Sequence, residues 1–420
     1  MKSKRKGSSF NAISSKRELE TVILFTTGKC NQKCAMCFYA NDMEQKAADN
    51  SFEDIQKFSQ SAGNFKRLLL SGGEPTLRED LPEILEMFHK NNGVTDINLP
   101  TNGMQTERLI EWITRLRKSC PDCNLTISVS LDGFGQTHDT QRGVESFYKT
   151  AQTLKKLDDH FGDDGHIIKN IATIITKYNV DEIVDFMCWV YGRFNVSTHT
   201  IEAARGNTRE SGVKILTEKS LTAIQDRIAP YYLLYAKRIG AGMNFIGRGI
   251  TKFFYVGLMR AMYNLRAKNI EKPTSWNMDC TAGETTLVID YDGRFRACEM
   301  REPVGHIKDY NCDAKAIMTS EAMKLEVAAI GHGYKANCWC THGCWMMTSI
   351  TFNPGKMISM LIKANKETKK LSKQYPLSID KNINIDKDTL RQLEIKYKLD
   401  IDKLERIGLG AASAEGTALK

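Results

Sequence analysis

Residues 26–40, TTGKCNQKCAMCFYA, are the most informative part of the sequence. It continues the apolar run TVILFT (21–26) and carries Cys30, Cys34 and Cys37 at the spacing C-x3-C-x2-C. A loop of this length can direct three thiolates at one iron–sulfur cluster, for which thiolate is the usual ligand. Because the loop supplies no fourth cysteine, one iron of a four-iron cluster would stay open to another ligand. A zinc site, or a cluster with a fourth ligand from elsewhere in the chain, is the alternative.

Apolar runs alternate with amphipathic stretches over the first half of the chain. This pattern predicts strands at 21–26, 67–70, 94–99, 125–130, 168–175 and 196–202. It predicts helices between them at 52–61, 80–91, 105–118, 145–159 and 180–192. Strands separated by helices indicate an α/β fold with a parallel sheet, which six units would close into a partial barrel. Ligands of such sheets bind at the carboxyl ends of the strands.

Further motifs follow the expected strands in order. SGGEP (71–75) follows the second strand and TNG (101–103) the third, whereas SLDG (130–133) ends the fourth and precedes His138 and Arg142. Together with the cysteine loop, whose third cysteine is followed by an aromatic residue, these motifs resemble the radical S-adenosylmethionine (radical SAM) superfamily. The resemblance implies a partial (β/α)6 barrel in which three cysteines hold a [4Fe–4S] cluster and SAM binds its open iron.

The resemblance also implies which residues surround SAM. The glycines are expected to let the backbone approach the methionyl amine, and Ser130 and Arg142 resemble a pair that contacts the ribose and carboxylate of SAM. The implied reaction cleaves SAM to a 5′-deoxyadenosyl radical, which abstracts hydrogen from the substrate. No catalytic residue toward the substrate is assigned. The expected SAM contacts are Ser71, Gly72, Gly73, Glu74, Pro75, Asn102, Ser130 and Arg142.

A second cysteine-rich region begins at Cys280. The segment 286–298 predicts a hairpin because it contains an Asp-Gly pair, and a CWCTHGC run follows at 338–344. The region resembles the SPASM and twitch auxiliary domains, and five cysteines plus Cys312 suit one auxiliary [4Fe–4S] cluster, the twitch arrangement. A structural zinc site is the alternative. The expected ligands are Cys280, Cys298, Cys340 and Cys344, with Cys338 as the alternative to Cys340.

Other residues receive narrower predictions. Cys120 and Cys123 form a C-x-x-C pair that we expect to be two exposed thiols at a helix end, with a redox or metal pair as the alternative. Cys188 is expected in the core. Glu202 and Arg205 follow the sixth strand, where SAM or substrate should lie, and Arg205 would clamp an anionic group or form a salt bridge.

Composition limits the setting of the protein. The chain has 420 residues, and it contains no run of 18 apolar residues that would cross a membrane. Twelve cysteines without an export signal favour metal ligation in the cytoplasm. The net charge of +9 permits an anionic partner, but with no RNA-binding module visible we expect no nucleic acid. The expected parts are a disordered basic tail (1–18), a radical SAM core (19–207), a helical insert (208–275), an auxiliary-cluster domain (276–350) and a basic helical tail (351–420).

The predicted function is hydrogen abstraction from an organic substrate. A sugar-like or other small metabolite is favoured, because about twenty residues before the first strand leave no room for a peptide-recognition domain. A peptide-modifying or sulfatase-maturase-like enzyme is the alternative, and a non-catalytic iron–sulfur carrier or scaffold is the alternative of another class. Expected partners are SAM, a flavodoxin- or ferredoxin-type electron donor and, through the helical stretches 251–268 and 356–373, a weak membrane contact.

Overall fold

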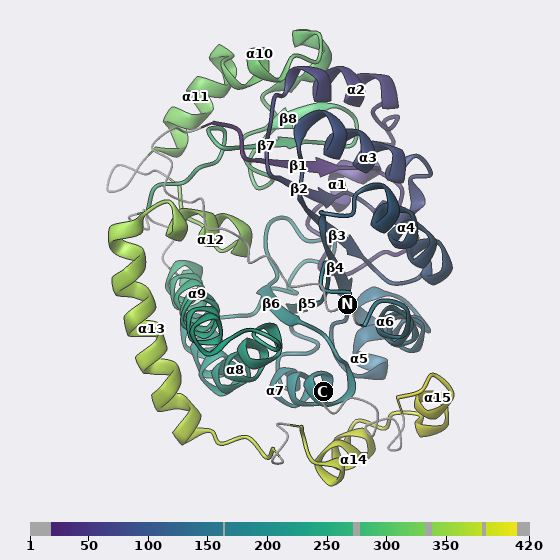
Figure 1. Ribbon diagram of the computed structural model, residues 1–420, viewed down its shortest axis with the longest axis vertical. Helices are drawn as coiled ribbons and strands as arrows, with labels where there is room; N and C mark the ends of the chain where they lie inside the picture. The colour runs from purple at the N-terminus through teal and green to yellow at the C-terminus, as the bar shows by residue number, and fades with distance from the viewer. Residues whose placement is uncertain (1–17, 163, 272–277, 332–337, 380–383, 410–420) are drawn as a thin grey trace.

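The computed structural model describes residues 18–162, 164–271, 278–331, 338–379 and 384–409, so the expected N-terminal tail lies almost entirely outside the described residues. Its centre is a sheet in which six parallel strands lie side by side in chain order (Figure 1). This arrangement confirms the predicted α/β fold with a partial barrel. The strands are β1 (Thr21–Phe25), β2 (Arg67–Ser71), β3 (Asp96–Thr101), β4 (Asn124–Ser130), β5 (Ile167–Ile175) and β6 (Thr198–Ala203).

The helices between these strands use apolar residues at helical spacing to cover the sheet. In α4 the residues Leu109, Ile113 and Leu116 recur at a spacing of three or four and are all buried. Helices form at each of the five places where the pattern predicts one. They are α2 (Phe52–Ser61), α3 (Leu81–Asn92), α4 (Thr106–Ser119), α6 (Ser146–Phe161) and α7 (Ile183–Arg193).

Three short elements lie inside the loops that carry the motifs. Helix α1 (Ala40–Glu44) follows the cysteine loop, the 3-10 turn η1 (Pro75–Leu77) follows the two glycines of SGGEP, and α5 (Gly135–Arg142) follows SLDG. Because α5 ends at Arg142, the helix determines where this side chain enters the site. The apolar pattern alone predicts none of the three.

The predicted hairpin extends the same sheet. Strand β7 (Thr286–Ile289) pairs in parallel with β1, and β8 (Arg294–Arg296) returns antiparallel to β7. Gly293 in the turn has φ +89, a left-handed conformation that glycine adopts without strain. Strand β9 (Gly305–His306) completes the order β6-β5-β4-β3-β2-β1-β7-β8-β9. The cysteine-rich region therefore begins at the β1 edge of the barrel.

Helices form the remainder of the C-terminal half. Helix α9 (Phe245–Glu271) packs between α8 (Glu218–Ile239) and α13 (Pro354–Gln374) at the β6 side of the sheet (Figure 1). Within the described residues no helix is both long and apolar enough to cross a bilayer. The remaining helices of this half are η2 (Ile307–Tyr310), α10 (Ala314–Met318), α11 (Glu321–Ile330), α12 (Gly343–Thr351), α14 (Lys387–Lys396) and α15 (Ile401–Arg406).

Candidate functional site

The loops at the carboxyl ends of the parallel strands enclose one cavity of about 210 Å³. All three cysteines of the first loop line it, and so do all eight residues that sequence analysis places around SAM. The structure therefore brings together eleven residues that four separate loops supply. These residues are Cys30, Cys34, Cys37, Ser71, Gly72, Gly73, Glu74, Pro75, Asn102, Ser130 and Arg142.

The cysteine loop is held by backbone hydrogen bonds to the SGGEP loop. The Gly73 N–H donates to the Thr27 carbonyl at 2.8 Å, and the Glu74 N–H donates to the Lys29 carbonyl at 2.8 Å. A Cβ atom on Gly73 would lie 2.0 Å from the Lys29 carbonyl oxygen, a distance that no side chain permits. Glycine at this position therefore lets the two loops pack backbone to backbone.

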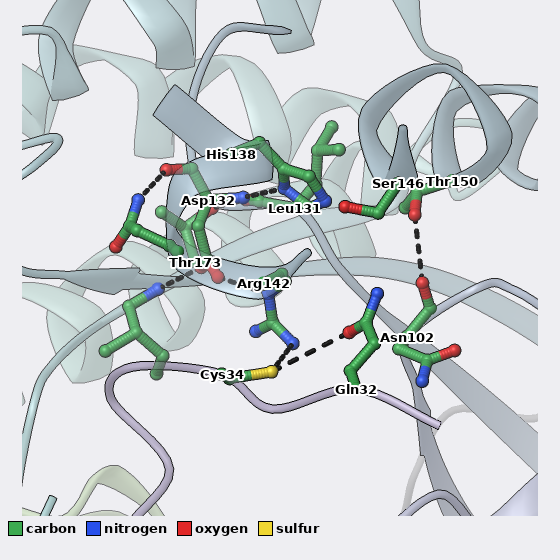
Figure 2. A network of polar contacts seen from close by, with 12 residues as sticks. Gln32, Cys34, Asn102, Leu131, Asp132, His138, Arg142, Ser146, Thr150 and Thr173 are labelled. Atoms are coloured by element: carbon green, nitrogen blue, oxygen red, sulfur yellow. Dashed lines mark hydrogen bonds and ion pairs between the residues drawn. The ribbon is translucent and has the colours of Figure 1, made fainter. Parts of the chain in front are cut away.

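Arg142 joins the cysteine loop to the ends of β4 and β5 (Figure 2). Its Nη1 lies 3.7 Å from Cys34 Sγ, and its Nε donates to the Asp132 carboxylate. The other Asp132 oxygen accepts from the Ile174 N–H at 2.7 Å. Burial raises the pKa of Asp132, against the opposing effect of the Arg142 charge. The guanidinium is thus fixed beside a sulfur atom, where it favours thiolate or another anion.

The buried Glu74 carboxylate holds neighbouring loops together through hydrogen bonds. It accepts from the hydroxyl groups of Thr76 (2.7 Å) and Thr101 (2.8 Å) and from the Asn102 N–H (2.7 Å). The Asn102 side chain in turn donates to Asn31 in the cysteine loop at 2.7 Å. These bonds connect the loops after β1, β2 and β3, so Glu74 positions the residues that face the cavity.

The sulfur atoms of the first loop have the surroundings of cluster ligands. Burial raises the pKa of the Cys30 thiol to about 11 and also raises the pKa of Cys34 and Cys37. Backbone N–H groups counter this effect, because that of Gln32 is directed at Cys30 and that of Tyr39 at Cys37. Donors aimed at sulfur stabilise the thiolate form that a metal cluster requires.

The spacing of these sulfur atoms favours a cluster over a single zinc ion. One tetrahedral zinc with bonds of about 2.3 Å would bring its sulfur ligands to about 3.8 Å from one another. Among the described residues, three ligand atoms lie within 4.8 Å of one another only at His89, Cys120 and Cys123. At least two of the three sulfur atoms of the first loop therefore lie farther apart than 4.8 Å, which is too far for ligands of one zinc ion.

The second cysteine region repeats the same local geometry. The N–H two residues after each of three cysteines points at its sulfur: Ala282 toward Cys280, Met300 toward Cys298 (3.5 Å) and His342 toward Cys340 (3.3 Å). Burial raises the pKa of Cys280 to about 11. Cys280, Cys298 and Cys340 therefore share one local turn, in which a backbone N–H faces the sulfur atom.

Cys338 and Cys344 differ in their neighbours. The Cys338 sulfur lies within electrostatic range of Cys280 and Cys340 and raises the pKa of both thiols, after the larger effect of burial. Cys344 lies in the first turn of α12, and desolvation followed by the carboxylates of Glu299 and Glu202 raises its pKa to about 12. The two cysteines thus have different neighbours, thiols for Cys338 and carboxylates for Cys344.

Arg205 connects the cavity to this second region. It lines the cavity, its guanidinium lies 4.8 Å from the centre of the Phe38 ring, and its Nη2 is 3.4 Å from Glu299 Oε1. His342 Nε2 lies 3.1 Å from the same oxygen. Glu202, expected to point toward SAM or substrate, instead binds Arg266 through both carboxylate oxygens at 2.6 Å.

Other cysteines are placed as follows. Cys120 and Cys123 are buried, so the expectation of two exposed thiols is wrong, because the loop after α4 turns inward before β4. Cys188 is partly buried and packs against the core as expected. Sequence analysis missed Asp132 as the partner of Arg142 and missed Ile174 and Ala203 as cavity residues, although all follow or end parallel strands.

Comparison with known proteins agrees with this site. Residues 24–190 match the radical SAM superfamily. They form a radical SAM domain. Over this stretch, which is less than half of the chain, the match confirms the superfamily that the motifs predict, a superfamily of enzymes that use a [4Fe–4S] cluster and SAM.

Curated relatives match this chain over only part of their own length. A probable GTP 3′,8-cyclase of Methanococcus maripaludis strain C7 is 31% identical over 155 residues, 34% of this chain and 50% of that protein. An Fe-coproporphyrin III synthase of Methanosarcina barkeri strain Fusaro is 29% identical over 40% of each chain. The chain thus spans about half the length, or less, of these relatives.

A solved structure shares the fold over a longer stretch. The structure described as native anSMEcpe with bound AdoMet and Cp18Cys peptide matches 83% of this chain and 99% of its own, with a TM-score of 0.54 and 16% identity. At this identity the likeness concerns the fold. It shows that the radical SAM domain and much of the C-terminal half follow an arrangement already seen in one polypeptide.

Proposed function

We propose that this chain holds a [4Fe–4S] cluster on Cys30, Cys34 and Cys37 and binds SAM in the adjoining cavity. When bound, the cluster supplies the electron that cleaves SAM to a 5′-deoxyadenosyl radical, which takes hydrogen from a substrate. One observation carries the proposal: the three cysteines and all eight motif residues line one cavity. A carrier or scaffold has no use for such a pocket, so this arrangement speaks against the non-catalytic alternative.

The chain's own residues would bind and orient SAM. Arg142, fixed by Asp132, presents positive charge toward an anionic group in the cavity. Apolar side chains of Met36, Phe38 and Met43 form part of the lining and would exclude water from the reacting atoms. Glu74 would act as a positioning residue, because its carboxylate is already bound by three neighbouring residues.

Formation of 5′-deoxyadenosine tests the proposal. The anaerobically reconstituted protein, given SAM and a reductant, should produce it, and Cys34→Ala should lower the rate at least 100-fold. Cys188→Ala removes a partly buried thiol on α7 and should retain wild-type activity. A fully loaded wild-type protein that forms no 5′-deoxyadenosine would show a carrier instead.

The proposal includes one auxiliary [4Fe–4S] cluster in the region 276–350. The N–H groups aimed at Cys280, Cys298 and Cys340 support these three ligands, and the fourth is Cys344 or Cys338. Iron analysis should give about eight irons per chain, and about four after Cys298→Ala. Comparing Cys338→Ala with Cys344→Ala identifies the fourth ligand, because only its loss should halve the iron content.

A small anionic metabolite is the proposed substrate class. Arg205 faces the cavity beside an aromatic ring, an arrangement that suits a phosphate, a carboxylate or a sugar carrying one. Relatives named for GTP support the same class. The solved structure that shares the fold has a peptide bound, which keeps a peptide substrate as the second candidate. Arg205→Gln should raise the KM for an anionic substrate and leave SAM cleavage without substrate unchanged.

The remaining predicted partners complete the proposal. The free cysteines suit a cytoplasmic protein that receives electrons from a flavodoxin- or ferredoxin-type donor. The expected weak membrane contact now concerns the start of α9, where Phe245 and Ile246 are exposed, whereas Val256 to Met262 are buried against neighbouring helices. Flotation with anionic vesicles tests this contact, which Phe245→Ser should weaken.

A further inference from the structure

His89, Cys120 and Cys123 meet at the end of the sheet opposite the SAM cavity. His89 lies in the last turn of α3, Cys120 directly follows α4, and Cys123 directly precedes β4. The amino ends of β3 and β4 are at this edge, whereas the cavity lies at their carboxyl ends. These three residues therefore belong to a separate place in the fold.

Their ligand atoms converge more closely than those of any other such group in the described parts of the chain. One nitrogen of His89 and the two sulfur atoms all lie within 4.8 Å of one another. Cys123 Sγ is 3.3 Å from His89 Nδ1. Both cysteines are almost completely buried, at 1% and 0% exposure. This spacing suits one metal ion, and it is too small to hold a [4Fe–4S] cluster.

The second nitrogen of His89 has a partner that would prepare it for metal binding. Nε2 lies 3.4 Å from the Asp122 carboxylate, which lies between the two cysteines in the chain. Because a carbonyl oxygen can only accept, Nδ1–H donates to Val94 in the metal-free protein, and metal binding would require the proton to stand on Nε2 beside this carboxylate instead. The Val94 carbonyl oxygen, 2.9 Å from Nδ1 and 3.2 Å from Cys123 Sγ, offers a further donor atom.

We propose that His89, Cys120 and Cys123 bind one Zn²⁺ ion. The two thiols lose their protons to solvent as two sulfur–zinc bonds form, and Nδ1 supplies the third ligand after its proton has been exchanged through solvent for one on Nε2. The Val94 carbonyl oxygen or a water molecule takes the fourth position. Two sulfurs and one imidazole are ligands that zinc prefers. Because the ion would join the ends of α3 and α4 to the start of β4, its role is to stabilise the barrel.

Zinc content and zinc spectroscopy test the proposal on the full chain with its iron–sulfur clusters loaded. After incubation with Zn²⁺ and desalting, wild type and Cys188→Ser should retain about one zinc more than Cys120→Ser or His89→Gln. In wild type, X-ray absorption at the zinc edge should show two sulfur neighbours at about 2.3 Å and lighter neighbours at about 2.0 Å. The second measurement needs no variant, so it decides even if a variant fails to fold.

Two results would overturn the proposal. One is equal zinc retention by wild type, Cys120→Ser and His89→Gln, which would place the metal elsewhere. The other is a Cys120–Cys123 disulfide, detected by mass spectrometry of the alkylated protein, together with no retained zinc. Neither result would affect SAM cleavage, because the site lies at the far end of the strands from the cavity.

Discussion

At the residue scale, the candidate site depends on one buried ion pair. Arg142 is 11% exposed and Asp132 fully buried, and together they tie the end of α5 to β5 and to the cysteine loop. A buried pair gains little net stability over apolar residues of the same size, but removing one partner leaves an uncompensated charge. The pair is therefore better explained by the charge that it presents beside Cys34 than by its contribution to stability.

Arg142→Ala should lower the free energy of unfolding by about 3–5 kcal/mol and weaken SAM binding. The double variant Arg142→Met/Asp132→Asn removes both charges, so it should recover most of the stability and still bind SAM poorly. Urea denaturation measures the first effect and equilibrium dialysis with SAM the second. Wild-type SAM affinity in the double variant would contradict a role of the guanidinium in binding.

At the element scale, the site depends on how loops and helix ends fit together. The SGGEP loop packs its backbone on the cysteine loop at Gly73. The start of α7 reaches the loop before α5, because the Glu182 carboxylate accepts from the Phe134 N–H at 2.8 Å and from the Thr137 hydroxyl at 3.1 Å. The contact at Gly73 leaves no space for a side chain, and burial disfavours the charged form of Glu182, so both positions are sensitive to small changes.

Gly73→Ala should prevent the cysteine loop from closing, because the added methyl group would lie 2.0 Å from the Lys29 carbonyl oxygen. We expect loss of about half of the bound iron in the reconstituted protein, since only the first cluster is affected. Gly249→Ala is the matched control, because nothing lies within 4 Å of its added carbon and it stands in a helix. The free energy of unfolding of that variant should increase by up to about 1 kcal/mol, because alanine has a higher helix propensity than glycine. Full iron content in Gly73→Ala would contradict this prediction, because it would show that the cysteine loop can shift to accommodate the methyl group.

Glu182 should make stability depend on pH. Desolvation raises the pKa of its carboxyl from 4.5 to about 7. A folded-state pKa above the unfolded one contributes stability at low pH that is lost as pH rises from about 4.5 through about 7. Glu182→Gln stays neutral, so its free energy of unfolding relative to wild type should increase by up to about 3 kcal/mol between pH 4.5 and pH 8. A constant difference across this range would refute the assignment.

At the scale of the whole molecule, distant parts of the chain close the barrel on both sides. Strand β7 pairs with β1 at one side, and α14 packs against α7 at the other (Figure 1). The contact of α14 centres on Glu394, which accepts from Trp189 Nε1 at 3.1 Å and lies 2.7 Å from Arg193 Nη2. Because Glu394 and Arg193 are almost fully buried, this C-terminal helix is part of the core structure.

Glu394→Ala should lower the free energy of unfolding by about 3–5 kcal/mol, because the Arg193 charge would lose its buried partner. Lys396→Ala in the same helix breaks an exposed pair with Asp185 and should cost less than about 1 kcal/mol. Chemical denaturation compares the two, and limited proteolysis between α13 and α14 should be faster only in Glu394→Ala. Equal stability of both variants would show that α14 is not needed to cover α7.

The alternation of strands and helices, the cysteine spacing and the order of the motifs could all be predicted from the amino-acid sequence. Each of these arises from residues a few positions apart, such as the buried run of β1 or the three cysteines of one loop. The approximate position of the hairpin also follows locally, from its Asp292-Gly293 turn.

Which side chains come into contact depends on the folded arrangement of the strands and helices. The Arg142 contact with Cys34 joins residues 108 positions apart, and His89 meets Cys123 across 34 positions. No local pattern records these pairings, because they depend on the order of strands in the sheet and on where each helix ends. Burial of Cys120 and Cys123 follows from the same cause, since the core that encloses them is supplied by neighbouring elements.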